Sequence, residues 1–410
     1  MSIVTTETRR RHAELVLILG SLSAFASLSI DMYLPSLPTL ERAFAVSPAA
    51  VQFTLTTFFL GFALGQAIYG PVADRFGRKP PLYVSLTLFS AASAGCALAP
   101  TVGGLAALRF VQAIGACAGG VISRAMVRDL FPPEETRRVY STLMLVTGVA
   151  PIAAPLLGGF ILVGVGWAAI FWTLAGLGIA CLAAVHFRLP ESHGRDAIRP
   201  LHLGTILATY GRLLSDRSFL GNALVGGFSL AGVFAYIAGS PFVFIKLYGL
   251  PADRYGWLFG ANSLGLVAAA QVNGRLLHGV SLRKVMVAAG LAQCLAGLLL
   301  AAAARTGAFG IAGLIVPLFA YLMALGFIAP NATALAMAPH GRVAGAASAL
   351  LGTLQFTLAA IAPVAVGAFA GSGATPMAIV VAACGALGLL MNGLIPAAKP
   401  LDTTDRDGDA

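Results

Sequence analysis

Two charged residues stand inside long apolar stretches of this sequence, and charges in such places are candidates for chemistry. Asp31 is the one acid among 16 that falls clearly inside an apolar stretch, and Arg109 lies inside another. A charge surrounded by hydrocarbon is costly and is kept mainly where it has a partner or a water-filled path. At about 1.5 Å per helical residue, both side chains lie at a similar depth. We therefore expect Asp31 to bind and release a proton beside Arg109, with Gln112 continuing the polar stripe of that helix.

Both residues also have simpler interpretations. Asp31 lies shortly before Pro35, so the acid could be hydrated at the end of its helix. Arg109 could extend its guanidinium to the lipid headgroups. A wall of packed apolar side chains between the Asp31 carboxyl and the Arg109 guanidinium would argue against their pairing.

Two segments have compositions suited to movement. The first reads GPVADRFGRKP from Gly70 to Pro80, and its charges must lie in water, in a tight loop between two apolar stretches. The second reads GVAPIAAPLLGG from Gly148 to Gly159, where prolines remove helix donors and glycines make a flat packing face. The expected gating residues are Gly70, Asp74, Arg75, Gly77, Arg78, Pro151, Pro155, Gly158, Gly159 and Arg124. For Arg124 a solvated helix end is the simpler interpretation, because surface ion pairs are weak.

The composition identifies the surroundings of the chain. Of its 410 residues, 58% are hydrophobic and 10% are charged, whereas a soluble domain carries about 25% charged residues. Lipid is therefore the expected solvent. The net charge of +10 does not indicate a nucleic-acid partner, because most lysines and arginines fall in loops on one side, which places both termini in the cytoplasm. The five cysteines lie in apolar stretches without a CxxC pair, so neither a metal nor another cofactor is expected.

The elements that hold these residues are about twelve apolar spans of roughly twenty residues, the length that a bilayer core requires. We place them near residues 15–35, 50–71, 81–99, 104–127, 140–163, 167–187, 218–241, 254–276, 284–304, 308–332, 342–369 and 374–396. A polar segment divides them into two sets of six. The predicted organisation is an N-terminal half over 1–187, a cytoplasmic linker over 188–217, a C-terminal half over 218–398 and a tail over 399–410.

Several segments agree in order and spacing with one family. Asp31 to Pro35 reads DMYLP, Arg109 to Gly115 reads RFVQAIG, and Tyr236 to Phe242 reads YIAGSPF. With the first loop and the proline-rich fifth span, the chain resembles the major facilitator superfamily, and within it the Bcr/CflA group of bicyclomycin and chloramphenicol resistance transporters. The resemblance implies an all-α membrane protein of twelve transmembrane helices, in two six-helix halves related by pseudo-symmetry.

The resemblance also implies a function. It implies proton-coupled efflux of antibiotics across the bacterial inner membrane by a monomer embedded in lipid, with small drug molecules as partners and protons in place of a cofactor. Asp31 and Arg109 would couple proton movement to drug transport, and spans one, four, seven and ten would line the cavity. The substrate-binding residues expected on this basis are Tyr33, Gln112, Tyr236, Ser240, Phe327 and Asn331.

Other classes of protein remain to be weighed. A carrier of the same fold with an amino acid or a sugar as cargo would have the same spans. A membrane enzyme would show embedded histidine, glutamate or cysteine clusters, and a channel would show a pore-lining ring; the sequence shows neither pattern. Because the first span holds no second acid, we expect neutral or zwitterionic substrates rather than cations.

Overall fold

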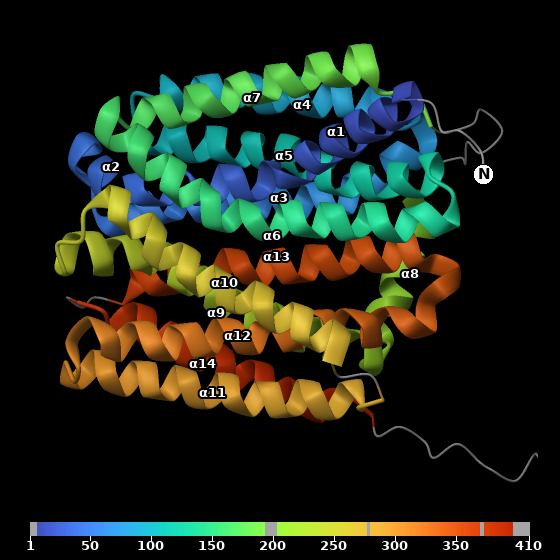
Figure 1. Ribbon diagram of the computed structural model, residues 1–410. Coiled ribbons are helices and arrows are strands. Elements are labelled where there is room, and N and C mark those ends of the chain that lie inside the picture. The colour runs from blue at the N-terminus through green and yellow to red at the C-terminus, as the bar shows by residue number, and fades with distance from the viewer. Residues whose placement is uncertain (1–5, 193–202, 277–278, 370–372, 397–410) are drawn as a thin grey trace, which may run out of the picture.

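The chain folds into a bundle of helices. The computed structural model describes residues 6–192, 203–276, 279–369 and 373–396, and these contain no strand. Twelve long helices of the described chain run side by side (Figure 1). The first six are α1 (Thr6–Asp31), α3 (Pro48–Phe76), α4 (Lys79–Ala97), α5 (Val102–Leu130), α6 (Pro133–Gly164) and α7 (Trp167–Arg188). The other six are α9 (Arg217–Pro241), α10 (Ala252–Leu276), α11 (Leu282–Thr306), α12 (Gly310–Met337), α13 (Ala344–Ala368) and α14 (Thr375–Met391).

Shorter elements lie at the two ends of the bundle. At the end that we call the far end, η1 (Leu34–Ser36) and α2 (Leu37–Phe44) follow α1, and the π-helix η3 (Phe242–Leu247) extends α9. At the opposite end, the linker end, α8 (Leu203–Ser215) precedes the second set of long helices, so the predicted linker is partly helical. Two further turns are η4 (Ala338–Val343) and η5 (Asn392–Leu394). The predicted tail over 399–410 lies outside the described residues.

Each long helix overlaps one predicted span, and their ends differ by at most nine residues, the largest difference being the earlier start of α1 at Thr6. Ten helical segments of the described chain are long and apolar enough to cross a membrane, and α4 and α10 lie among them in the bundle (Figure 1). The chain is therefore a multi-pass membrane protein. The break expected between the fifth and sixth spans is confirmed, because α6 ends at Gly164 and α7 begins at Trp167. Gly166 makes this turn with a φ of 109°, a conformation that favours glycine.

The two sets of six helices form two groups that face each other (Figure 1). Between the groups, α3 packs against α13 and α6 packs against α10. Small residues allow the close approach of α6 and α10. A Cβ added at Gly159 would meet the carbonyl oxygen of Ala252 at 2.5 Å, and one added at Gly256 would meet the backbone of Leu156 at 2.7 Å.

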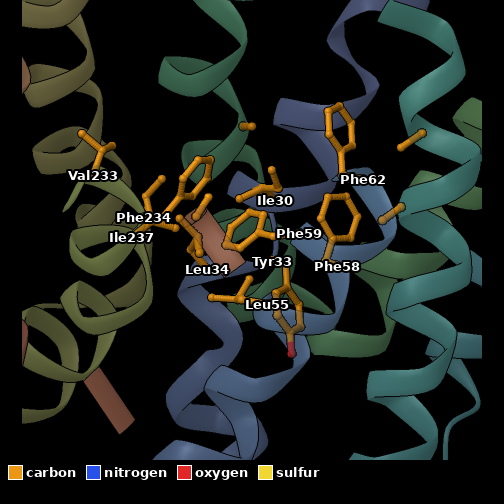
Figure 2. Packing of buried hydrophobic residues seen from close by; sticks show 14 of the residues in the cluster. Ile30, Tyr33, Leu34, Leu55, Phe58, Phe59, Phe62, Val233, Phe234 and Ile237 are labelled. Carbon is orange, nitrogen blue, oxygen red and sulfur yellow. The ribbon is translucent and has the colours of Figure 1, made fainter. Parts of the chain in front are cut away.

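Aromatic side chains fill the middle of the interface between the groups (Figure 2). The rings of Phe59 on α3 and Phe234 on α9 have centroids 4.2 Å apart. Those of Phe62 on α3 and Phe356 on α13 lie 4.4 Å apart, and Phe58 stacks on Phe62. These rings form an aromatic layer between the two ends of the bundle.

Candidate functional site

An inner cavity of about 370 Å³ lies between the two groups of helices, on the linker side of the aromatic layer. Its walls come from α1, α3, α5 and α6 of the first group and from α12 and α13 of the second. A second cavity of about 310 Å³, nearer the linker end, shares Gln66, Arg124, Tyr140 and Ser348 with the first. The two cavities therefore form one path from the linker end to the middle of the bundle.

The far end of the bundle is closed by contacts between the groups. Lys246 on η3 donates to both carboxylate oxygens of Glu41 on α2, at 2.7 and 2.9 Å. Gln52 on α3 donates to the carbonyl of Ala238 on α9 at 3.1 Å. An outer cavity of about 500 Å³ at this end shares no lining residue with the inner cavity. The structure therefore represents a state that is open toward the linker end.

Asp31 is the last residue of α1 and lies beneath the closed far end. It keeps only 4% of its surface exposed. Its carboxylate forms no hydrogen bond or ion pair with any residue that the structure describes. The turn η1, three residues further along the chain, packs against α6 of the first group and against α9 and α10 of the second. The acid thus lies at the boundary between the two groups of helices.

Arg109 lies at a similar depth on α5 but does not pair with Asp31. Its guanidinium is fully buried and donates to the carbonyl of Ser29 at 3.0 Å and to Gln112 at 2.6 Å. This contact is to the backbone of Ser29, two residues before Asp31, and no ion pair joins Arg109 to the acid among the described residues. The expectation that Arg109 pairs with the acid was therefore wrong, although both side chains are buried.

Arg109 is held among aromatic rings. Its guanidinium carbon lies 4.2 Å from the ring centre of Phe58 and 4.6 Å from that of Tyr33. A cation over aromatic faces is stabilised by the ring quadrupoles, which partly replaces the water it has lost. Arg109 therefore fastens α5 to the last turn of α1.

The residues expected to bind substrate do not line the inner cavity in this structure. They are Tyr33, Gln112, Tyr236, Ser240, Phe327 and Asn331. Their polar groups bond to neighbours inside their own group of helices, as in Tyr33 with Thr54 at 2.8 Å and Ser240 with Tyr255 at 2.7 Å. Phe327 packs with α9 and α11 residues around Ile328. Counting residues along a span gives the depth of such residues, but it does not give the neighbours that their side chains meet.

The inner cavity is lined instead by residues that the sequence reasoning missed or ranked low. Phe62 and Phe356 form the wall of the cavity that belongs to the aromatic layer. Gln66 lines the cavity from the first group of helices and Gln355 from the second. Gln66 was detectable as a lone amide inside an apolar stretch. Arg124 lines the cavity rather than closing it.

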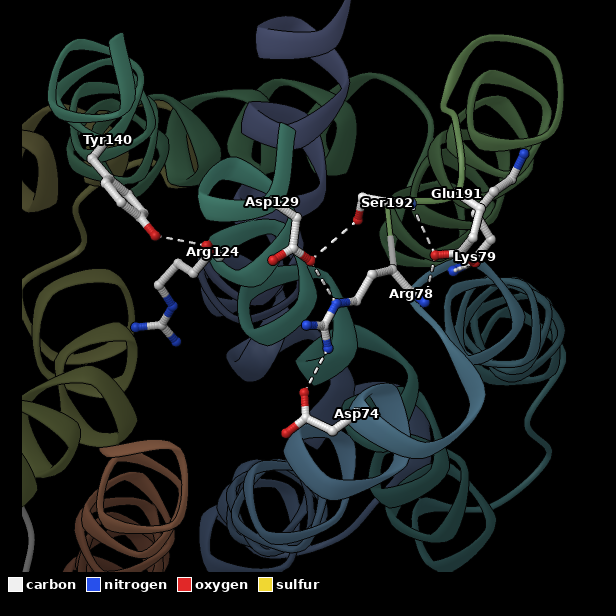
Figure 3. A network of polar contacts seen from close by, with 8 residues as sticks. All are labelled: Asp74, Arg78, Lys79, Arg124, Asp129, Tyr140, Glu191 and Ser192. Atoms are coloured by element: carbon white, nitrogen blue, oxygen red, sulfur yellow. Dashed lines mark hydrogen bonds and ion pairs between the residues drawn. The ribbon is translucent and has the colours of Figure 1, made fainter. Parts of the chain in front are cut away.

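A polar network holds the linker end of the first group together (Figure 3). Arg78 binds Asp74 at 2.7 Å and Asp129 of α5 at 2.9 Å. The two carboxylate oxygens of Glu191 accept hydrogen bonds from the backbone N–H groups of Arg78 and Lys79. Burial lowers the pKa of Arg78, but hydrogen bonds to the two aspartates outweigh this effect and raise its pKa above the ordinary value.

Of the two arginines expected among the gating residues of this loop, Arg78 is the one that pairs with Asp74. Arg75 is exposed and makes no ion pair in the described part of the chain, whereas Arg78 takes that place. Gly77 has a φ of 88°, and this left-handed turn separates the two arginines. Gly70 lines the second cavity, with open space where a Cβ would lie.

The fifth span behaves as a packing helix. Pro151 and Pro155 lie inside α6. A Cβ added at Gly158 would fall against the carbonyl oxygen of Met32 in the same group, while Gly159 contacts the second group at Ala252. The flat glycine face expected from the sequence therefore touches both groups of helices at the far end.

Two facing groups of membrane helices, with a cavity that reaches their middle from one end, define the class of the protein as a membrane transporter. The model of the Major Facilitator Superfamily matches residues 19–363, and the chain belongs to this superfamily. A transporter was also the class that the sequence favoured over a membrane enzyme.

The chain is similar to bacterial transporters over most of its length. It is 38% identical to an uncharacterized MFS-type transporter of Bacillus subtilis, over 88% of this chain and 90% of that one. It is 34% identical to the bicyclomycin resistance protein homolog of Haemophilus influenzae, with coverages of 92% and 94%. It is 30% identical to a chloramphenicol resistance protein of Pseudomonas aeruginosa, with coverages of 84% and 80%. The resemblance to the Bcr/CflA group is thereby confirmed.

Solved structures share the fold. A D-xylose-proton symporter superposes with a TM-score of 0.74 at 16% identity, covering 94% of this chain and 97% of the other. The human organic anion transporter MFSD10 gives a TM-score of 0.71 at 17% identity, with coverages of 94% and 99%. At these identities the likeness concerns the fold alone.

Proposed function

We propose that the protein exports small antibiotic molecules across the bacterial inner membrane in exchange for protons. The observation that carries the proposal is the inner cavity, which reaches the middle of the bundle from one end and is lined by aromatic rings, neutral polar groups and one arginine, Arg124. The distribution of lysines and arginines assigns the linker end and both termini to the cytoplasm. The state described here would therefore take up its cargo from inside the cell, as a monomer in lipid.

The cavity favours moderately apolar drugs over the alternative cargo, an amino acid or a sugar. Ser23, Thr147 and Tyr140 donate their hydroxyl hydrogens to backbone carbonyls of the protein. Few polar groups are left for a cargo that is dense in hydroxyls or charges, whereas an apolar site with a few polar groups suits a drug-sized molecule. The names of the Haemophilus and Pseudomonas relatives point in the same direction.

Asp31 is the residue that we assign to the proton. An acid buried in a membrane protein without a cation partner is a group that can take up and release a proton when water reaches it. Asp31 lies at the boundary between the groups, just before the turn η1 that packs against α9 and α10. A movement of one group against the other would therefore change its surroundings and its access to water. Arg109 would keep the acid in place by holding α1.

Expression in a drug-sensitive bacterium tests the proposal. The wild-type protein should raise tolerance to chloramphenicol, florfenicol or bicyclomycin, and Asp31→Asn should abolish the gain at equal protein abundance. Asp253→Asn is the matched control: this acid lies in the first turn of α10 and is less buried than Asp31, so its replacement is expected to leave tolerance at the wild-type level. Full tolerance in Asp31→Asn, or no gain from the wild-type protein with any of the three compounds, would contradict the proposal.

A further inference from the structure

The inner cavity carries one kind of charge. Among its lining residues in the described chain, Arg124 is the charged one, and no acid is present. Asp31 lies apart from this cavity and does not line it. The acid Asp31, from which the substrate preference was predicted, is therefore not part of the inner cavity that a ligand would occupy in this state.

The guanidinium of Arg124 is available to a ligand. Its Nε donates to the carbonyl of Gly120 at 3.0 Å, and no carboxylate of the described chain lies within ion-pair distance of it. Tyr140 on α6 donates to the backbone carbonyl of Arg124 at 2.6 Å. Figure 3 shows the side chain extending away from Asp129 and Asp74. The cation is thus anchored at its backbone while its outer nitrogens face the cavity.

The path into the cavity has the same sign of charge. The second cavity is lined by Arg78, Arg124 and Arg128, with Asp74 as the acid. Asp74 and Asp129 both bind the Arg78 guanidinium, which offsets one of their two negative charges, and Arg124 and Arg128 together outweigh the other, so the path keeps a net positive charge. A path with low-dielectric walls and an excess of one charge concentrates ions of the opposite sign. Anions would be drawn into this path and organic cations repelled.

The remaining lining can hold uncharged aromatic compounds. Gln66 of the first group lies against Gly352 of the second, and Gln355 lies against Gly226. Neither carboxamide forms a hydrogen bond within the described part of the chain, so both donors and acceptors remain for a ligand. The Phe62 and Phe356 rings offer an apolar wall above them.

We infer that the inner cavity selects its ligand by charge, accepting uncharged and anionic aromatic compounds and excluding organic cations, and that Arg124 sets this preference. The inference rests on the proposed function in that this cavity is taken as the place where cargo binds. It names the substrate class of the exporter and assigns a specificity-determining role to a residue outside the helix that carries Asp31.

Charged thiol reagents test the sign of the cavity without any drug. Ser348 lines both cavities and is exposed, so Ser348→Cys in a background without the five native cysteines places a thiol on the path. The purified protein reacts with an anionic sulfonatoethyl and a cationic trimethylammonioethyl methanethiosulfonate. The ratio of anionic to cationic rate constants should exceed that of Thr205→Cys, a control thiol on exposed α8, by about tenfold.

Substitutions at Arg124 separate its effect from that of other charges. Arg124→Gln should bring the ratio close to the control value, and Arg124→Glu should reverse it. Arg212→Gln, which removes an exposed cation from α8 at the same end, should leave the ratio unchanged. A ratio at Ser348→Cys equal to that of Thr205→Cys, or one that neither Arg124 variant alters, would overturn the inference. The first of these outcomes does not depend on the folding of an Arg124 variant.

A matched series of compounds then tests selection during transport. Chloramphenicol is neutral, its succinate ester is an anion, and its deacylated base is a cation when its amine is protonated. In proteoliposomes the cation should be transported at least about tenfold more slowly than the neutral compound, and Arg124→Glu should narrow that gap. Equal transport of cation and neutral compound would overturn the inference. If the thiol ratios reveal a positive cavity but no compound of the series is transported, antibiotic export fails and the charge preference of the cavity stands.

Discussion

The guanidinium of Arg109 donates a hydrogen bond of 3.0 Å to the backbone carbonyl of Ser29, two residues before the buried acid Asp31. The same nitrogen donates to Gln112 at 2.6 Å, and the group packs against the ring of Phe58. Arg109 therefore fixes the last turn of α1. Its part in coupling would be to hold the Asp31 carboxyl in position rather than to neutralise it.

Replacing Arg109 tests this positioning role. Arg109→Ala removes a fully buried side chain and leaves the Ser29 carbonyl without its donor, so we expect a loss of roughly 2–4 kcal/mol in stability and most of the proton-coupled transport. Arg109→Lys keeps the charge but loses the planar guanidinium that packs over the Phe58 and Tyr33 rings, so its transport should be intermediate. Thermal unfolding in detergent and transport in proteoliposomes would measure the two effects.

Ser29→Ala is the matched control for this prediction. The Ser29 hydroxyl bonds to the Phe25 carbonyl in its own helix at 2.6 Å, while Arg109 uses the backbone, which alanine retains. This variant should lose only about 0.5–1.5 kcal/mol and should keep most of its transport. Equal transport by Arg109→Ala and Ser29→Ala would refute the positioning role.

The helices could be predicted from the sequence, because a bilayer requires apolar stretches of about twenty residues that satisfy their own backbone. The depth of Asp31 and Arg109 followed from the same counting. The partner of Arg109 did not, because counting residues along a span does not give the neighbours that a side chain meets. The partner of Asp74 depended in a similar way on the left-handed turn at Gly77.

The lining of the cavity was harder to predict for a different reason. Residues such as Gln66 and Gln355 lie on α3 and α13, and they meet a common space only because the two groups of helices are packed in one particular state. That packing depends on contacts between residues far apart in the chain, such as Gln52 with Ala238. No periodicity within a single helix contains this information.

The ion pair between Glu41 and Lys246 should stabilise the closed far end. It joins α2 to η3 across the two groups, and the Lys246 side chain is 54% exposed. Exposed ion pairs contribute about 0.2–1 kcal/mol, so Glu41→Gln should raise the population open at the far end by up to about fivefold. The reaction of Val243→Cys, a buried position in the lining of the outer cavity, with an impermeant thiol reagent would report this change.

A charge reversal provides the control for that prediction. Glu41→Lys alone should open the far end further, because it places two cations together. Combining it with Lys246→Glu should restore the wild-type reaction rate. If the double variant reacts as fast as Glu41→Lys alone, the pair does not govern closure.

The two aspartates that bind Arg78 should differ in their contribution to stability. The side chain of Asp129 is 18% exposed and that of Asp74 is 57% exposed, although their distances to Arg78 are similar. Asp129→Asn should therefore cost about 1.5–3 kcal/mol, as for a shielded bond between charged groups, and Asp74→Asn about 0–1 kcal/mol. Thermal unfolding of both variants, each also combined with Arg78→Gln, would measure the coupling. A larger loss in Asp74→Asn would show that exposure does not decide the order.

Close packing at Gly158 should be required for the position of the buried acid. A Cβ there would fall against the carbonyl oxygen of Met32, the residue that follows Asp31. Gly158→Ala should therefore cost about 1–3 kcal/mol through overpacking and should reduce transport, since it pushes the end of α1 away from α6. Gly164→Ala on the same helix has open space within 4 Å and should be neutral or gain up to about 1 kcal/mol from helix propensity. Unfolding temperatures and transport rates that are the same for the two variants would mean that the glycine face of α6 does not position Asp31.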